Sequence, residues 1–238
     1  MPEPYIDIVI PVYNEDKNIL RVLHAFEKEI KIPFRVLICY DRDTDTTLPV
    51  IRDNRFSFEV LAVKNEGKGA HGAVITGLYK SDAFAVISYM ADDDYNAAKI
   101  NDIYAKSLQG YDIVCPSRFI KGGNMIGCRW QKAFLVRSVA FTLHYLGRLP
   151  VHDPTNGFRM FSRKLLQNVK IESQAGFTYS IELLAKCHRL GWNMGEVPVE
   201  WYERTEGQSR FNIMKWARDY LKWYFYIFAT SYLGLRQI

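Results

Sequence analysis

Three adjacent carboxylates follow an apolar run near the middle of the chain. Asp92, Asp93 and Asp94 come directly after residues 84–90, whose side chains are typical of a buried strand. Neighbouring carboxylates repel one another, and oxygen-rich clusters of this kind usually bind a hard divalent cation. Asp92 and Asp94 therefore predict a site for Mg²⁺ or Mn²⁺, which would bridge a diphosphate and neutralise its charge as a leaving group. An acidic loop or a helix cap is the alternative interpretation.

A glycine-rich run upstream indicates a different chemistry. Residues Gly67 to Gly72 match the GxGxxG pattern of dinucleotide-binding enzymes, after an expected strand and at the start of an expected helix. The run lies in the third strand–helix unit rather than the first, and three acids are more than a ribose needs. An oxidoreductase that uses a dinucleotide is therefore the weakest alternative.

Two arginines lie beside glycines in the second half of the chain. Arg118 precedes Gly122 and Gly123, and Gly207 separates Arg204 from Ser209. Glycines beside arginines suit loops that close on phosphate, to which arginine binds through two parallel hydrogen bonds. Basic surface loops with no ligand are the alternative.

The hydrophobic pattern predicts the elements that position these residues. It predicts strands at residues 6–12, 34–40, 58–63 and 84–90, a helix capped by Asn14 with its apolar face over 19–30, and a helix at 70–80. This alternation is typical of a parallel α/β sheet, which binds ligands beyond the carboxyl ends of its strands. Glu15, Asp41 and Asp92 each follow a strand there. Asp41 is then predicted to contact a nucleoside, unless its polar loop, 41–47, is only a solvated turn.

The pattern changes after Val114. Glycine, proline and basic residues dominate 116–129, and a helix through Phe134 and Leu146, a helix near 179–190 and a strand near 196–201 follow. We expect one domain over residues 1–210, with a nucleotide-sugar half (1–115) and an acceptor half (116–210). Residues 211–238 are expected to form an aromatic and basic helical appendage.

The composition indicates whether the chain is ordered, what charge its partners carry and where in the cell it acts. Hydrophobic residues make up 48% of the chain, which supports an ordered core, and the net charge of +5 favours phosphates or a lipid surface over nucleic acid. Four cysteines without metal-ligand spacing, and no leader or long apolar span, predict a cytoplasmic protein. Aromatic residues are interleaved with basic ones over 215–235, which predicts peripheral attachment to the cytoplasmic membrane face, a packed terminal helix or a dimer contact.

Taken in order, these motifs resemble glycosyltransferase family 2, which has the Rossmann-like GT-A fold, and within it the dolichyl- and polyprenyl-phosphate mannose or glucose synthases. The resemblance rests on Ile10–Glu15, Asp41–Thr47, Gly67–Gly69, Asp92–Asn96, Ser117–Phe119 with Gly122-Gly123, Asp153–Arg159, Gly176-Phe177 with Glu182–Leu184, and Glu196–Ser209. It covers nearly the whole chain, and it replaces the dinucleotide interpretation of the glycine run. Tyr40 departs from the pattern, since relatives often carry an acid there, and Arg129–Arg137 does not align residue for residue.

The resemblance implies a role for each candidate residue. It places the nucleotide sugar at Pro11, Tyr13, Glu15, Asp41, Lys68, Asp92 and Asp93, the metal at Asp92, Asp94 and Asn96, the acceptor phosphate at Arg118, Lys132, Arg137 and Ser209, and catalysis at Asp94, Arg118 and Arg204. GDP-mannose is the favoured donor and UDP-glucose the second, with a polyprenyl or dolichyl phosphate as acceptor.

An inverting transferase with a hydroxyl acceptor needs a general base. A lipid phosphate is already ionised and needs only screening of charge and in-line placement. If the acceptor is a hydroxyl of a polysaccharide or another glycan, Asp153 or Glu182 is the candidate base. A protein that binds sugar nucleotides without catalysis is the further alternative.

Overall fold

The computed structural model describes residues 5–203 and 213–235. Its strands are β1 (Ile6–Val12), β2 (Phe34–Tyr40), β3 (Glu59–Lys64), β4 (Ala85–Ser88), β5 (Ile113–Ser117), β6 (Asn124–Ile126), β7 (Arg159–Ser162), β8 (Met194–Pro198) and β9 (Glu200–Tyr202). Its helices are α1 (Ile19–Glu29), α2 (Thr47–Asp53), α3 (Gly69–Lys80), α4 (Lys99–Leu108), α5 (Trp130–Phe141), the π-helical turn η1 (Thr142–Leu146), α6 (Arg163–Asn168), α7 (Thr178–Arg189) and α8 (Ile213–Tyr232).

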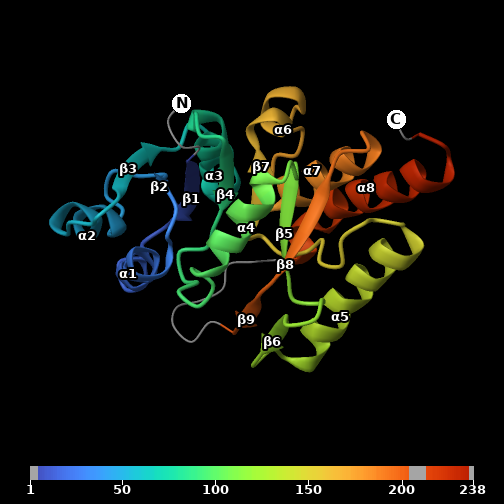
Figure 1. The fold of residues 1–238 in the computed structure, drawn as a ribbon, viewed down its shortest axis with the longest axis horizontal. Coiled ribbons are helices and arrows are strands. Elements are labelled where there is room, and N and C mark those ends of the chain that lie inside the picture. The colour runs from blue at the N-terminus through green and yellow to red at the C-terminus, as the bar shows by residue number, and fades with distance from the viewer. Residues whose placement is uncertain (1–4, 204–212, 236–238) are drawn as a thin grey trace.

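Within these residues, the strands form a seven-stranded sheet in the order β3-β2-β1-β4-β7-β5-β8, and β6 pairs with β9 in a small second sheet (Figure 1). The pairs β1–β2, β1–β4, β2–β3 and β5–β8 are parallel, whereas β7 is antiparallel to both β4 and β5. The expected fold class, a mostly parallel α/β sheet flanked by helices, is therefore confirmed. The large sheet continues through both of the predicted halves.

Alternating strand residues face two apolar layers. Ile8 and Ile10 pack with α1 and α4 on one face, and Val9 packs with α3 on the other, where α7 and α8 also contribute. On α1 the buried side chains recur at helical spacing, and α3 approaches the sheet so closely that a Cβ at Gly77 would lie 2.4 Å from a methyl of Val9. Both faces are covered, as the continuous apolar strands require.

Several expected boundaries are confirmed and some are wrong. Strands β1 and β2 begin and end where the pattern predicts. Asn14 is not the cap of α1, because it lies four residues before Asn18, the residue that precedes the helix, and has a φ of +55°. The single strand expected near 196–201 is two strands, β8 and β9, in different sheets.

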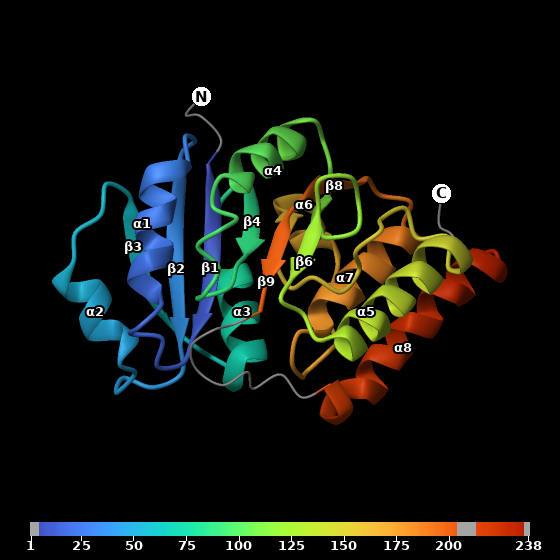
Figure 2. The same ribbon diagram turned by 90° about the horizontal axis from the view of Figure 1, so that it is seen from below.

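The helices α5 and α8 lie at the same end of the molecule, far from β3 (Figure 2). Helix α8 packs on α7 and buries Trp223 and Ile227. Helix α5 is packed far less, since Ala140 is the one buried side chain among its twelve fully described residues. No helix in the described part of the chain combines the length and the apolar character that crossing a bilayer requires.

Candidate active site

The loops after β1 and β2 are held together by Asp45. Its buried carboxylate accepts hydrogen bonds from the backbone N–H of Asn14 (3.1 Å) and of Thr47 (2.9 Å), and the Thr47 hydroxyl accepts one from the N–H of Glu15 (2.9 Å). These hydrogen bonds hold the turn that carries Tyr13 and Glu15 at the carboxyl edge of the sheet. No sequence signal distinguishes Asp45 from the other polar residues of its loop.

Asp41 holds the glycine-rich loop in place. Its carboxylate accepts from the N–H of Gly69 (3.1 Å) and from the side-chain amide of Asn65, whose own oxygen accepts from the N–H of Gly67 (2.7 Å). A Cβ at Gly67 would lie 2.9 Å from the Cα of Gly72, so the glycines are needed for close backbone approach. This loop leaves Lys68 exposed beside Asp41, at the start of α3.

Asp94 and Asp92 lie in the loop after β4. One carboxylate oxygen of Asp94 pairs with Nε of Arg21 on α1 at 2.9 Å, and the other is buried without a hydrogen-bond partner among the described residues. A buried carboxylate oxygen left without a donor suits a cation ligand. The described residues hold no preassembled group of three His, Cys, Asp or Glu side chains for a metal. Two carboxylates suffice for Mg²⁺ only where oxygens of a bound phosphate or water complete the coordination.

Asp93 is turned toward the protein rather than toward this edge. Its carboxylate accepts from the N–H of Tyr95 (3.2 Å) and of Asn96 (3.1 Å) and from the Asn96 side-chain amide (2.9 and 3.0 Å). Burial raises the pKa of Asp93 to about 6, against the lowering effect of the Asn96 hydrogen bonds. The Asn96 amide also bonds to both backbone groups of Glu200. These contacts shape the acidic loop.

Arg118 and Asp153 form a buried ion pair. The guanidinium donates from Nε and Nη2 to the two carboxylate oxygens at 2.7 and 2.8 Å, and the backbone N–H of Arg118 adds a third bond at 3.0 Å. Burial acts to raise the pKa of the Asp153 carboxyl, but Arg118 outweighs it and holds that pKa below its usual value. The Arg118 side chain is thus bound to Asp153, which the sequence did not indicate.

Glu182 is also buried and fully bonded. Its carboxylate accepts from the backbone N–H of Glu172 (2.6 Å) and of Ser173 (2.7 Å), and from Nζ of Lys186 (2.6 Å). Like Asp153, it has no exposed surface. Both carboxylates that the sequence offers as a base for a hydroxyl acceptor therefore serve structural contacts.

The remaining predicted residues lie on the acceptor side or outside the described residues. Lys132 of α5 is half-exposed, lies 4.3 Å from the ring of Trp201 and is 3.3 Å from the carboxylate of Glu203. Arg137 is exposed on the same helix. Arg204 and Ser209, predicted to contact phosphate, fall in the part of the chain that the structure leaves undescribed.

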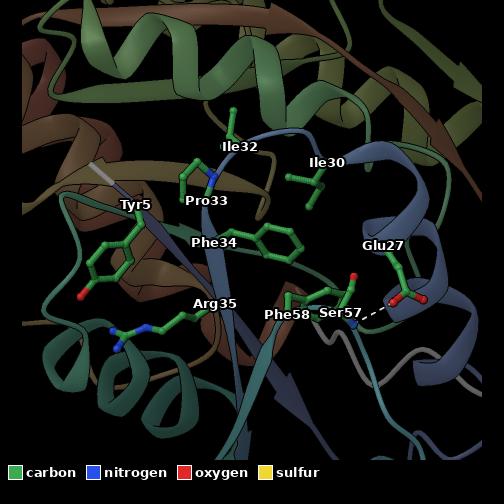
Figure 3. A pocket seen from close by; sticks show the side chains of 9 residues that line it. All are labelled: Tyr5, Glu27, Ile30, Ile32, Pro33, Phe34, Arg35, Ser57 and Phe58. Carbon is green, nitrogen blue, oxygen red and sulfur yellow. Dashed lines mark hydrogen bonds between the residues drawn. The ribbon is translucent and has the colours of Figure 1, made fainter. Parts of the chain in front are cut away.

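Two hollows lie at different edges of the sheet, one away from the predicted site residues and one beside them. One of about 680 Å³ lies at the amino edge of the sheet, lined by Phe34, Phe58 and Glu27 among others, and is thus opposite the acids (Figure 3). Its arginine, Arg35, is bound by Asp7 and Asp82. The other, of about 570 Å³, is lined by Lys68 and His71 and borders the glycine loop. The second hollow thus borders the edge at which parallel sheets bind ligands.

Known proteins share this fold and sequence pattern. The chain superposes on glucosyl-3-phosphoglycerate synthase from Mycobacterium tuberculosis, crystallised with Mn²⁺, UDP and glucosyl-3-phosphoglycerate, with a TM-score of 0.66 at 17% identity over 98% of this chain and 80% of that one. It is 27% identical to a dolichyl-phosphate hexose transferase of Haloferax volcanii over 86% of either chain. It is 23% identical to a polyprenol monophosphomannose synthase of Mycolicibacterium smegmatis, over 86% of this chain and 80% of that one.

The model of the family described as glycosyl transferase family 2 matches residues 7–170, which is more than half of the chain. The matched segment contains Asp41, the glycine loop, the acidic loop and the Arg118–Asp153 pair, so the family pattern and the carboxyl-edge site coincide. The protein therefore belongs to glycosyl transferase family 2, and it is a glycosyltransferase with the GT-A fold.

Proposed function

We propose that the protein transfers a hexose, with inversion, from a nucleoside-diphosphate sugar to a polyprenyl or dolichyl phosphate. The observation that carries this proposal is the state of Asp153 and Glu182, which are buried and bonded and so are not placed to take a proton from a hydroxyl. A phosphate monoester is ionised at neutral pH and attacks without a base. The names of the two relatives above support the same acceptor class.

The donor is assigned to the carboxyl edge of β1, β2 and β4. There Pro11, Tyr13 and Glu15 would contact the nucleoside together with Asp41, and exposed Lys68 would face the diphosphate. GDP-mannose is the first donor to test and UDP-glucose the second.

Asp92 and Asp94 would hold Mg²⁺ or Mn²⁺, whose charge stabilises the departing nucleoside diphosphate. The unpartnered oxygen of Asp94 supports this assignment, and Asp93 supports the loop through the hydrogen bonds that it accepts from Asn96. Arg204 is proposed as a further cation at the leaving group.

The acceptor phosphate is assigned to the basic side chains near α5. Lys132 and Arg137 would screen its charge, with Ser209 as a further donor. The assignment of Arg118 to this phosphate stays a prediction, because contact would require its guanidinium to exchange Asp153 for the ligand.

We also propose that α5, η1 and α8 lie against a lipid surface. On α5, Trp130 is 74% and Phe134 is 69% exposed, and Tyr145 of η1 and Phe225 of α8 are exposed as well. Exposed Arg129, Arg137 and Arg148 complement anionic headgroups. Aromatic residues interleaved with arginines are typical of a bilayer interface, and such a position would give the enzyme a lipid-linked acceptor.

The acceptor is tested by nucleotide release from GDP-mannose and from UDP-glucose with Mg²⁺ or Mn²⁺. Each donor is offered a short polyprenyl phosphate, the matching polyprenol, which has a hydroxyl in place of the phosphate, or 3-phosphoglycerate. Release with polyprenyl phosphate, but not with the polyprenol or with 3-phosphoglycerate, supports the proposal. Equal release with the polyprenol would establish a hydroxyl acceptor, and release with 3-phosphoglycerate alone would establish a soluble phosphorylated one.

Membrane attachment is tested by flotation with vesicles of neutral or partly anionic lipid. The double variant Trp130→Ser, Phe134→Ser should lose most of its binding, because these side chains contribute much of the exposed apolar area of α5. Leu108→Ser, at an exposed apolar position on α4, is the control and should bind as the wild type does. Unchanged flotation of the double variant would contradict the assignment.

A further inference from the structure

The side-chain amide of Asn96 lies between the acidic loop and strand β9. Its Nδ2 donates to the carbonyl of Glu200 (2.7 Å), and its Oδ1 accepts from the N–H of Glu200 (3.2 Å). On its other edge, β9 pairs with β6, where the N–H of Asn124 donates to the carbonyl of Val199 and that of Glu203 to Ile126. Asn96 therefore bonds to backbone groups on the edge of β9 that does not pair with β6, as a neighbouring strand would.

The same amide is bonded to the acidic loop itself. Nδ2 also donates to both carboxylate oxygens of Asp93, at 3.0 and 2.9 Å, and the whole residue is only 5% exposed. A carboxamide offers two N–H donors and one acceptor oxygen. Here Asp93 and Glu200 take both N–H donors, and the oxygen that would bind a cation accepts from the N–H of Glu200.

Two further contacts join β9 to its surroundings. The ring of Tyr95 stacks on that of Tyr202, with centroids 4.2 Å apart and planes at 29°. On the other side, Lys132 of α5 lies over Trp201. Strand β9 thus contacts the acidic loop through Asn96 and Tyr95, and the predicted acceptor helix through the side chain of Trp201.

We infer that Asn96 is a positioning residue rather than a metal ligand, and that it ties the acidic loop of the donor site to β9 and thereby to the acceptor side. The part that concerns the acceptor rests on the proposed function. Because Lys132 rests on β9, release of β9 would move the acceptor cation relative to the donor. Loss of Asn96 should then impair use of the acceptor more than binding of the metal.

The test compares Asn96→Ala and Asn96→Asp with the wild type by hydrogen exchange, by Mn²⁺ titration and by steady-state kinetics. In both variants the amides of residues 199–203 should exchange about tenfold faster, because both substitutions remove the hydrogen bond from Asn96 Nδ2 to the Glu200 carbonyl of β9. Asp keeps an oxygen ligand and an acceptor for the N–H of Glu200, but it has no N–H to donate to the Glu200 carbonyl, so it should still release β9. The KM for polyprenyl phosphate should rise in both variants, while Asn96→Ala keeps nearly the wild-type affinity for Mn²⁺ alone.

Asn101→Ala is the matched control, because the Asn101 amide makes the same pair of backbone bonds elsewhere. It donates to the carbonyl of Glu29 (2.9 Å) and accepts from the N–H of Lys31 (2.8 Å). Its loss should speed exchange at residues 29–31 and leave both β9 and the KM for the acceptor unchanged.

Three outcomes would overturn the inference. They are wild-type exchange at 199–203 in both Asn96 variants, an unchanged KM for the acceptor, or a loss of Mn²⁺ affinity in Asn96→Ala of about tenfold or more, as expected for a residue bound to the metal or to one of its ligands. A wild-type protein that does not transfer to polyprenyl phosphate would instead contradict the proposed function. The exchange and Mn²⁺ measurements would still decide the role of Asn96 in that case.

Discussion

The carboxylates of the two halves of the molecule differ in what surrounds them. In the first half, Asp94 keeps one oxygen without a hydrogen-bond partner among the described residues, and the other is held by a half-exposed arginine, Arg21. In the second half, Asp153 and Glu182 are fully buried, and backbone N–H groups and a cation bond both of them.

This difference shows that residue type alone does not identify a catalytic acid. A carboxylate that lacks donors can accept a cation or a proton, whereas one that already receives several charge-assisted bonds is held as an anion and stabilises the fold. The comparison therefore predicts that substitution of Asp94 reduces activity, whereas substitution of Asp153 or Glu182 reduces stability.

The largest expected effect is on activity. Asp94→Asn should lower kcat/KM by at least about 100-fold, because the charge that would hold the metal is lost. Its thermal midpoint should stay close to the wild-type value, since the pair with Arg21 is partly exposed and contributes little. Asp102→Asn, an exposed acid of α4, is the control and should be fully active. Near-normal turnover of Asp94→Asn would remove the metal assignment.

The next effect is on stability. Asp153→Asn keeps the shape of the side chain but leaves the buried Arg118 without a counter-charge, which should lower the free energy of unfolding by about 3–5 kcal/mol. Urea unfolding measures this change. If the variant instead unfolds as the wild type does and loses turnover, Asp153 acts as a base and the comparison between the two halves fails.

The same pair should give stability a dependence on pH. The folded pKa of Asp153 lies below the ordinary value of 3.8, so its contribution is complete above that pH and is lost as the pH falls below it. The difference in unfolding free energy between wild type and Asp153→Asn should therefore be constant near neutral pH and shrink toward about pH 3. A difference that grows on acidification would contradict the lowered pKa.

Glu182→Gln should cost less than Asp153→Asn. Glutamine keeps one acceptor oxygen for the backbone N–H of Glu172 or of Ser173, and Lys186 keeps a second partner in Glu172 at 3.0 Å. We expect a loss of about 1–3 kcal/mol in urea unfolding with nearly unchanged turnover on polyprenyl phosphate. Turnover that collapses while stability is kept would identify Glu182 as a base.

Much of the first half was predictable because its signals are local. The apolar runs of β1 and β2 set their own boundaries, and parallel strands place the acids that follow them at one edge. The four-residue β7 was missed, since it begins with a buried arginine, Arg159, that no strand pattern suggests.

The partners of the site residues were not predictable, because they are distant in sequence. Asn96 meets Glu200 at a separation of 104 residues, and Arg118 meets Asp153 at a separation of 35. A charged side chain is visible in the sequence, but the group that neutralises it is not. Arg118 was therefore predicted to meet a ligand, whereas the structure bonds it to Asp153.

The smallest expected effect concerns Arg21, the one partner that the first half supplies to Asp94 in the described structure. A cation that binds Asp94 must compete with this guanidinium. Arg21→Gln should therefore tighten Mn²⁺ binding by up to about fivefold, the size expected for loss of a partly exposed ion pair, with little change in stability. Titration with Mn²⁺ alone measures this change, and Lys28→Gln on the same helix is the control. Weaker Mn²⁺ binding by Arg21→Gln would mean that Asp94 needs Arg21 to hold its position. The Asp94 carboxylate would then be held by a structural ion pair, as that of Asp153 is, and the contrast between the two would fail.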